Sequence, residues 1–253
     1  MSAFDPFARY YDADHGAFTD DIPFYREMAR RTGGPILEVM CGSGRVLAPL
    51  AADGHAITGL DISPRLLALA REKLAAAGRA GRAELVVGDA RHAVPRGPFA
   101  LAIIALNSFM HLTTVDDQLA ALRQIHAALR PGGVLAIDLF NPDPRELARR
   151  GGELVFDKAF TLSDGTVVHK FVAQRLDAAE QTSHVTFFYD EQLADGTVRR
   201  AALPFTMRWL YRYELEHLLA RAGFVLETVY GSYDLDDYSS ASEQMLAVAV
   251  RPG

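Results

Sequence analysis

The stretch from Pro35 to about Phe140 alternates short apolar runs with longer amphipathic segments. This alternation is typical of βαβ units, in which helices join parallel strands and cover the sheet. Five strands are expected in this part of the chain, at about 36–39, 56–60, 84–87, 101–106 and 134–139. The pattern therefore predicts an α/β fold with a doubly wound, mostly parallel sheet.

Two helices within this stretch are marked by residues typical of helix ends. Ser63 followed by Pro64 is a favoured helix start, and Gly78 is a favoured stop. A second helix is expected over about 115–129, because its apolar residues recur on one face and a Pro-Gly-Gly segment follows it.

From about Gly151 the apolar residues recur at every second position, which is typical of antiparallel strands. Two Asp-Gly pairs, at 164–165 and 195–196, lie between extended segments and predict hairpins. With a third reversal near 177–181, four antiparallel strands are expected over about 153–207. A helix at 213–222 and strands at 224–230 and 245–250 would complete a seven-stranded sheet. We thus expect an N-terminal core over 1–150, an antiparallel β insertion between strand five and the last helix over 151–207, and completion of the core sheet over 208–253.

The composition limits the classes of function and the compartment. A net charge of −6 and a pI near 5.7 argue against a protein whose main task is to bind nucleic acid. The single cysteine, Cys41, and the absence of a Cys/His cluster predict no zinc site and agree with a reducing cytoplasm. No leader-like or long apolar segment occurs, so we expect a cytoplasmic protein without a membrane partner.

A glycine-rich turn lies between the first expected strand and the helix that follows it. The turn contains Glu38, Cys41, Gly42, Ser43 and Gly44. Glycines allow the backbone to approach a ligand closely, and the N-terminus of a helix favours polar or anionic groups. Alone, the turn is equally compatible with a tight connection that binds nothing.

Two acidic residues at neighbouring strand ends make the glycine turn more informative. Asp61 ends the second expected strand, and an acid there can accept hydrogen bonds from both hydroxyls of a ribose. Asp89, in Gly88-Asp89-Ala90, ends the third strand and is suited to the exocyclic amine of an adenine. Each aspartate alone could be a turn residue, but the three features together indicate a nucleoside-binding site.

These motifs resemble those of the class I S-adenosylmethionine-dependent methyltransferases, over about residues 5–140. The family has an acid and two glycines after strand one, an acid after strand two and Gly-Asp-Ala or Gly-Asp-Met after strand three. The segment Leu129-Arg130-Pro131-Gly132-Gly133 also resembles the stretch before its fifth strand. The resemblance implies S-adenosyl-L-methionine as cofactor. The cofactor-binding residues that it implies are Tyr11, Glu38, Gly42, Gly44, Asp61, Ile62, Gly88, Asp89, Ala90 and Leu106.

By the same resemblance, the glycine loop holds the methionyl end of the cofactor, and Tyr11 lies on an opening helix that folds over it. Asp61 would bind the ribose, Asp89 with the Ala90 amide the adenine, and Ile62 would lie against the adenine face. A nicotinamide dehydrogenase is the competing fold. The dehydrogenase fingerprint requires a third glycine at the position that Leu47 occupies. The dehydrogenase fold also leaves the Gly-Asp-Ala segment unexplained.

The chemistry is expected beside the segment 106–111, after strand four, because ligands bind beyond the carboxyl ends of parallel strands. Asn107 could position the substrate or cofactor, or could equally be a turn residue that satisfies its own backbone. His111 is a candidate general base, with a structural histidine as the alternative. Arg208, Trp209 and Tyr211 could form a substrate wall, although Trp209 could instead pack the insertion onto the sheet.

The expected activity is methyl transfer to an N or O atom of a small molecule. Relatives with small amine or hydroxyl substrates, including amino-sugar N-methyltransferases, resemble this chain in carrying antiparallel strands at the position of the insertion. The insertion is therefore a candidate lid, substrate platform or homodimer surface. A protein or RNA methyltransferase, or a cofactor-binding relative that does not methylate, are the alternatives.

Overall fold

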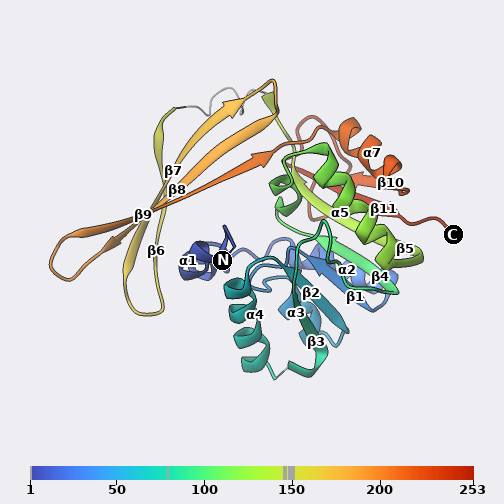
Figure 1. Ribbon diagram of the computed structural model, residues 1–253, viewed down its shortest axis with the longest axis horizontal. Coiled ribbons are helices and arrows are strands. Elements are labelled where there is room, and N and C mark those ends of the chain that lie inside the picture. The colour runs from blue at the N-terminus through green and yellow to red at the C-terminus, as the bar shows by residue number, and fades with distance from the viewer. Residues whose placement is uncertain (1, 79, 145–146, 148–151) are drawn as a thin grey trace.

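The protein forms two sheets joined by the chain between residues 140 and 154 (Figure 1). The structure is a computed structural model, and it describes residues 2–78, 80–144, 147 and 152–253. A seven-stranded sheet has the order β10-β11-β5-β4-β1-β2-β3, and a four-stranded sheet has the order β6-β7-β8-β9. The expected α/β fold with a separate antiparallel sheet is confirmed. The predicted domain boundary at 150/151 lies outside the described residues.

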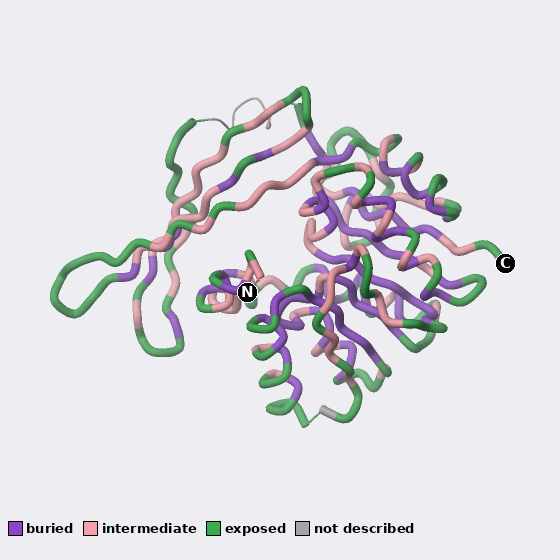
Figure 2. The backbone as a smooth tube through the Cα atoms, in the orientation of Figure 1, coloured by how far each residue is buried: buried purple, intermediate pink, exposed green. Residues whose placement is uncertain are grey.

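The seven-stranded sheet is parallel except at one edge, where β11 runs antiparallel to both β5 and β10. Its strands are β1 (Ile36–Val39), β2 (Ile57–Asp61), β3 (Ala83–Val87), β4 (Phe99–Ile104), β5 (Leu129–Phe140), β10 (Val225–Tyr230) and β11 (Gln244–Val250). Every residue of β1 and β4 is buried, as expected for central strands covered on both faces. Figure 2 shows this buried centre.

Helices cover both faces of this sheet. They are α1 (Ala8–His15), α2 (Ile22–Thr32), α3 (Leu47–Ala52), α4 (Pro64–Ala76), α5 (Val115–Ala128) and α7 (Arg212–Arg221), with short 3-10 turns η1 (Asp5–Phe7), η2 (Ala80–Arg82) and η3 (Ser108–His111). Apolar residues of α2, α3 and α4 form one core cluster with the sheet, and those of α5 and α7 form another. The predicted start of α4 is confirmed, because Ser63 Oγ accepts a hydrogen bond from Leu66 N at 3.2 Å.

Strand β4 ends two residues before the predicted end at Leu106. Leu106 and Asn107 have φ angles of 49° and 62°, in the left-handed region that non-glycine residues rarely adopt. These two residues therefore turn the chain out of the sheet and into η3. The apolar run suggested a longer strand because it continues to Leu106, whose backbone is not extended.

The insertion is a four-stranded antiparallel sheet of long strands: β6 (Leu154–Thr161), β7 (Val167–Asp177), β8 (Thr182–Gln192) and β9 (Val198–Arg208). Both predicted Asp-Gly hairpins are present, with Gly165 at φ 85° and Gly196 at φ 81°. The third reversal joins β7 to β8, where Asp177 pairs with Thr182. Helix α1 lies between this sheet and the core (Figure 1).

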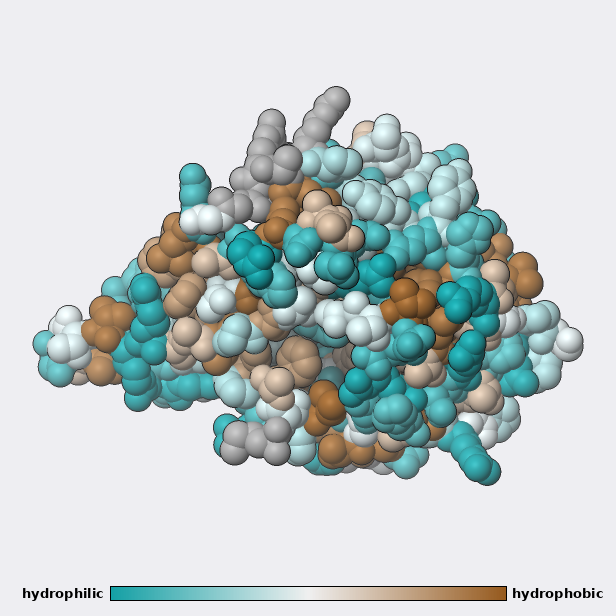
Figure 3. Space-filling view, turned by 45° about the horizontal axis from the view of Figure 1, so that its top comes forward, coloured by the Kyte–Doolittle hydropathy of each residue, from teal (hydrophilic) through white to brown (hydrophobic). Residues whose placement is uncertain are grey.

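The molecular surface is mixed in character on the face drawn in Figure 3, where hydrophobic side chains lie in several separate groups among hydrophilic ones. Within the described ranges, no helix combines the length and the apolar character needed to cross a membrane.

Candidate active site

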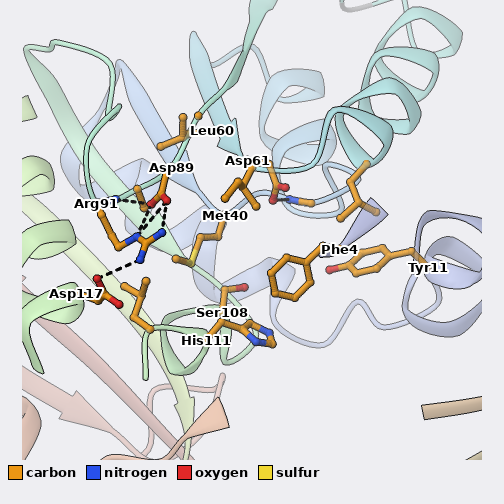
Figure 4. Close-up of a pocket in the computed structure, with 16 residues that line it drawn as sticks. Phe4, Tyr11, Met40, Leu60, Asp61, Asp89, Arg91, Ser108, His111 and Asp117 are labelled. Atoms are coloured by element: carbon orange, nitrogen blue, oxygen red, sulfur yellow. Dashed lines mark hydrogen bonds and ion pairs between the residues drawn. The ribbon is translucent and has the colours of Figure 1, made fainter. Parts of the chain in front are cut away.

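A pocket opens at the carboxyl ends of β1, β2 and β3, beside η3 (Figure 4). Of the sequence-predicted residues, those that line it are Tyr11, Gly42, Asp61, Ile62, Gly88, Asp89, Ala90 and His111. Three strand ends, η3 and the N-terminal helix thus bring these residues together. Met40, Leu60 and Leu112 supply apolar surface between the polar groups.

The glycine loop is closely covered by the N-terminal helix. Gly42 has a φ of 55°, and a Cβ atom at this position would lie 3.0 Å from the Tyr11 hydroxyl oxygen. Burial raises the pKa of the Tyr11 hydroxyl well above its usual value, so this group remains protonated. A glycine is required here both for the left-handed backbone and for the close approach of the tyrosine.

Asp61 connects the glycine loop to the start of α4. Its Oδ2 accepts a hydrogen bond from Gly42 N at 2.8 Å, and its Oδ1 accepts one from Ser63 N at 2.8 Å. Burial raises the pKa of Asp61 above its usual value, although these backbone hydrogen bonds oppose that effect. Each oxygen keeps a second lone pair, so the carboxylate can still accept hydrogen bonds from a ligand in the pocket.

Asp89 is held in an ion-pair network that sequence reasoning missed. Figure 4 shows Arg91 between Asp89 and Asp117. The Arg91 guanidinium lies 2.5 Å from Asp89 Oδ2 and 3.1 Å from Asp117 Oδ1. Hydrogen bonds from Arg91 lower the pKa of Asp89, which stays ionised. The position of Arg91, two residues after Asp89, could have indicated the ion pair between them. The contact of Asp117 with Arg91 could not be predicted, because it depends on how α5 packs.

These residues fit a nucleoside joined to an amino acid. At the glycine loop, which Tyr11 covers, a ligand has room to contact the backbone only. The Asp61 carboxylate suits two vicinal hydroxyls. The apolar walls of the pocket suit a flat base. Asp89 stands one strand further out, as an acceptor for an exocyclic amine. The chemistry of this donor and acceptor set therefore matches S-adenosyl-L-methionine.

The turn after β4, formed by Leu106 and Asn107, leads into η3, and Ser108 and His111 of η3 line the pocket. Asn107 Oδ1 accepts a hydrogen bond from Phe140 N at 2.6 Å, and its backbone N donates to Asp138 O at 3.0 Å. Leu106 N donates to the Asp138 carboxylate at 3.1 Å. Oδ1 of Asn107 therefore stabilises the left-handed turn, and the residue also lines the cavity on the other side of η3.

His111 is enclosed by aromatic rings at the end of η3. Its ring centre lies 4.9 Å from that of Phe4 and 5.5 Å from that of Phe205. Burial lowers the pKa of His111 to about 4, against a smaller opposite effect of a hydrogen bond to the Thr206 backbone. The imidazole is therefore neutral at physiological pH. Its buried Nδ1 has no hydrogen-bond partner in the described part of the chain.

Three residues predicted to contact the cofactor, Glu38, Gly44 and Leu106, do not line the pocket. Glu38 is only 3% exposed, and burial raises its pKa to about 8. A Cβ at Gly44 would meet the Ala70 Cβ at 3.1 Å, so this glycine allows the loop to pack on α4. Gly44 thus allows the loop to pack, Glu38 is buried in β1, and Leu106 belongs to the turn after β4.

A second cavity of about 820 Å³ lies on the other side of η3, between the core and the insertion sheet. We call it the acceptor chamber. Its walls come from the turn after β4, strands β6 to β9 and the loop before β11, and include Asn107, Asp157, Lys170, Phe205, Trp209 and Glu243.

The residues predicted as a substrate wall are only partly brought together. Trp209 lines the chamber, whereas Arg208 pairs with Glu214 at 2.9 Å and Tyr211 is exposed before α7. Neither of these two residues lines the chamber.

Comparisons with known proteins agree with this geometry. Residues 36–133 match the family described as a methyltransferase domain. The carboxy-S-adenosyl-L-methionine synthase of Chromohalobacter salexigens is 31% identical over 140 residues, which are 53% of this chain and 51% of that protein. The cypemycin N-terminal methyltransferase of a Streptomyces sp. is 28% identical over 220 residues, which are 87% of this chain and 84% of that protein.

A solved structure extends the likeness in fold to nearly the whole chain. CalS10, an amino pentose methyltransferase from Micromonospora echinaspora, has a TM-score of 0.71 and 23% identity, and the match covers 96% of each chain. The strand order, the glycine loop with its acidic strand ends and the matched methyltransferase domain lead to one assignment. Residues 36–133 carry a methyltransferase domain, and nearly the whole chain shares the fold of CalS10.

Proposed function

We propose that this enzyme methylates a small molecule bound in the acceptor chamber, and that the acceptor atom is the nitrogen of an amine. The chamber is the observation that carries the proposal. It lies across η3 from the pocket that fits the cofactor, and the insertion sheet forms one of its walls. A volume of about 820 Å³ is within the range of sites that bind small molecules.

The charges around the chamber favour an amine. Asp157 and Glu243 contribute carboxylates to its lining, and Lys170 contributes the cation. Lys170 Nζ lies 2.9 Å from Asp14 and 3.0 Å from Asp157, and Lys158 also pairs with Asp14, so these two lysines and two aspartates balance one another. The carboxylate of Glu243 would then attract a protonated amine that enters the chamber.

The weak basicity of His111 also favours nitrogen over oxygen. S-adenosyl-L-methionine supplies an activated methyl group when bound. A hydroxyl acceptor generally needs a base whose pKa lies near the working pH, and His111 has a pKa of about 4. An amine that has released its proton to solvent already presents a lone pair, so neutral His111 needs only to orient it.

The cofactor contacts are part of the same proposal. Tyr11 and Gly42 would hold the methionyl end, Asp61 the ribose hydroxyls, and Asp89 with the Ala90 amide the adenine. The support is that all five residues line one pocket. Arg91 already donates hydrogen bonds to the Asp89 carboxylate. It would have to give up some of them when the adenine amine binds to Asp89.

The name of one relative, an N-terminal methyltransferase, supports an amine acceptor, and that of another, an amino pentose methyltransferase, places an amino group on its substrate. The net charge of −6 is unfavourable for RNA phosphates. A cytoplasmic location and a homodimer through the insertion remain proposals.

The test fills the chamber without touching the cofactor pocket. Val172 in β7 lines the chamber, whereas its neighbour Ala173 does not, because successive strand residues point to opposite faces. Val172→Trp is compared with Ala173→Trp in an S-adenosylhomocysteine-release assay on small amines and matched alcohols, beginning with D-glucosamine and D-glucose.

The wild type and Ala173→Trp should methylate amines, and Val172→Trp should do so at least tenfold more slowly, because the tryptophan removes chamber volume. All three proteins should bind S-adenosylhomocysteine equally well. Turnover of alcohols in preference to amines would overturn the choice of nitrogen. Full activity of Val172→Trp would show that the acceptor does not bind in the chamber.

A further inference from the structure

Helix α1 contacts both ligand sites of the enzyme at once. It has eight residues and lies between the core and the insertion sheet (Figure 1). Tyr11 and Asp12 contact the glycine loop, whereas Tyr10 and Asp14 contact the insertion. At a rise of about 1.5 Å per residue the helix is about 12 Å long, so its two sets of contacts lie within about two turns of each other.

On the insertion side, the carboxylate of Asp14 contacts side chains from three strands, β6, β7 and β8. Its side chain is fully buried, and it accepts a hydrogen bond from the Tyr189 hydroxyl of β8 at 2.7 Å. Lys158 Nζ of β6 lies 2.6 Å from it, and Lys170 Nζ of β7 lies 2.9 Å from it. Lys170 and Tyr189 belong to the two central strands of the sheet, and Lys170 also lines the chamber.

A second buried carboxylate makes the reciprocal contact, from the sheet to the helix. Glu191 of β8 accepts hydrogen bonds from the Tyr10 hydroxyl at 2.8 Å and from Arg9 Nε at 2.7 Å. The rings of Tyr10 and Tyr189 stack between the two carboxylates, with centres 4.1 Å apart and an interplanar angle of 7°. Helix and sheet are therefore joined by charged groups of defined geometry, and a buried charge that loses its partner is costly.

On the cofactor side, α1 is joined to the glycine loop and α4. Ser43 Oγ donates a hydrogen bond to Asp12 Oδ1 at 2.5 Å, and Lys73 Nζ lies 2.6 Å from the same oxygen. Tyr11 lines the pocket directly above Gly42. A ligand that packs against Tyr11 would favour the docked position of α1.

We propose that α1 couples the cofactor pocket to the acceptor chamber, with Asp14 as the positioning residue that transmits the effect to β7 and β8. A ligand in the cofactor pocket stabilises docked α1, and docked α1 fixes the wall of the chamber through Asp14. Coupling is reciprocal, so a firmly docked sheet also strengthens cofactor binding by the same factor. The assignment of the chamber to the acceptor rests on the proposed function, whereas the coupling of pocket to sheet does not.

Hydrogen–deuterium exchange with S-adenosylhomocysteine as the probe tests this coupling without any acceptor. In the wild type, the probe should slow amide exchange in residues 167–192 by about fivefold or more, at the low end of typical coupling between sites. Asp14→Asn should still bind the probe, more weakly by a similar factor, and should lose this slowing. Asp190→Asn is the matched control, because Asp190 lies on the same sheet and pairs with Arg200 at 2.6 Å rather than with α1.

Tyr189→Phe is the second variant, in case Asp14→Asn does not fold. It removes only the hydroxyl that donates to Asp14, so it should reduce the slowing partially. Equal slowing in all folded variants, or no slowing in the wild type despite saturated binding, would overturn the inference. Because the readout needs no methyl acceptor, failure of the proposed small-amine activity leaves this test interpretable.

Discussion

The backbone nitrogen of Gly42 donates a hydrogen bond to Asp61 Oδ2 at 2.8 Å, so the loop after β1 is fixed to the end of β2 by one carboxylate. The same carboxylate receives the Ser63 amide at the start of α4. The residue proposed to hold the ribose therefore also sets the shape of the loop proposed to hold the methionyl group. Changes at Asp61 and Gly42 should affect binding through different physical causes.

Asp61→Asn should weaken S-adenosylhomocysteine binding by about 10- to 100-fold, because hydrogen bonds to a charged group contribute about 1.5–3 kcal/mol. Asparagine retains one carbonyl oxygen for Gly42 N, but its NH2 group then faces the Ser63 N–H, so a lower melting temperature should accompany the loss of affinity. Isothermal titration calorimetry gives the affinity. Asp53→Asn is the control, since Asp53 pairs with Arg26 away from the pocket, and equal affinities for both variants would contradict the ribose role.

Gly42→Ala should lose binding for a steric reason. Its Cβ would lie 3.0 Å from the Tyr11 hydroxyl, and the φ of 55° costs an alanine about 1–2 kcal/mol. We expect at least a tenfold loss of S-adenosylhomocysteine affinity together with a lower melting temperature. Gly81→Ala, where no atom lies within 4 Å of the added Cβ, should change neither quantity. A partial recovery of affinity in Gly42→Ala/Tyr11→Phe, which keeps the ring and removes only the hydroxyl, would identify the tyrosine contact as the cause.

Much of the fold could be predicted because the central strands are short, apolar and separated by clear helix ends. Two exceptions are the start of β5, which lies at Leu129 and not at the predicted 134, and the end of β4, where apolar Ala105 and Leu106 continue the strand pattern although the chain turns. Hydropathy does not report φ angles. The turn depends on Asp138, which is 32 residues away and accepts a hydrogen bond from Leu106 N.

The candidate site was predictable to the extent that its residues follow strand ends. Asp61 and Asp89 are recognisable from local sequence, and both line the pocket. The pairing of Arg91 with Asp117, and that of Asp14 with Lys170, join residues 26 and 156 positions apart. No periodicity encodes such contacts, because they result from the packing of separate elements.

His111 should remain neutral across the physiological range. Its pKa of about 4 lies below the usual 6.5, because burial disfavours the imidazolium. The ring signals of His111 in nuclear magnetic resonance spectra should therefore show no titration between pH 8 and about pH 5.5. The contribution of this histidine to stability should be complete above pH 6.5 and lost as the pH falls toward 4. A midpoint near 6.5 would restore the general-base role for a hydroxyl acceptor.

Glu38 should make the stability of the protein fall as the pH rises. Its folded-state pKa of about 8 exceeds the ordinary value of 4.5, because burial disfavours the carboxylate. Between pH 4.5 and 8 the folded protein keeps this proton and the unfolded chain loses it, so the free energy of unfolding decreases by up to about 1.4 kcal/mol per pH unit.

Glu38→Gln cannot ionise, so its stability advantage over the wild type should grow from pH 4.5 to 8 and then level off. Urea denaturation at pH 5, 6.5 and 8 measures the difference. Glu27→Gln is a control of opposite sign, because hydrogen bonds from Arg30 and Arg31 lower the pKa of Glu27 to about 2. Its effect should be constant over the same range and should disappear only as the pH falls from 4.5 toward 2. A constant difference for Glu38→Gln would mean that this carboxylate is already ionised in the folded protein and has a partner for its charge.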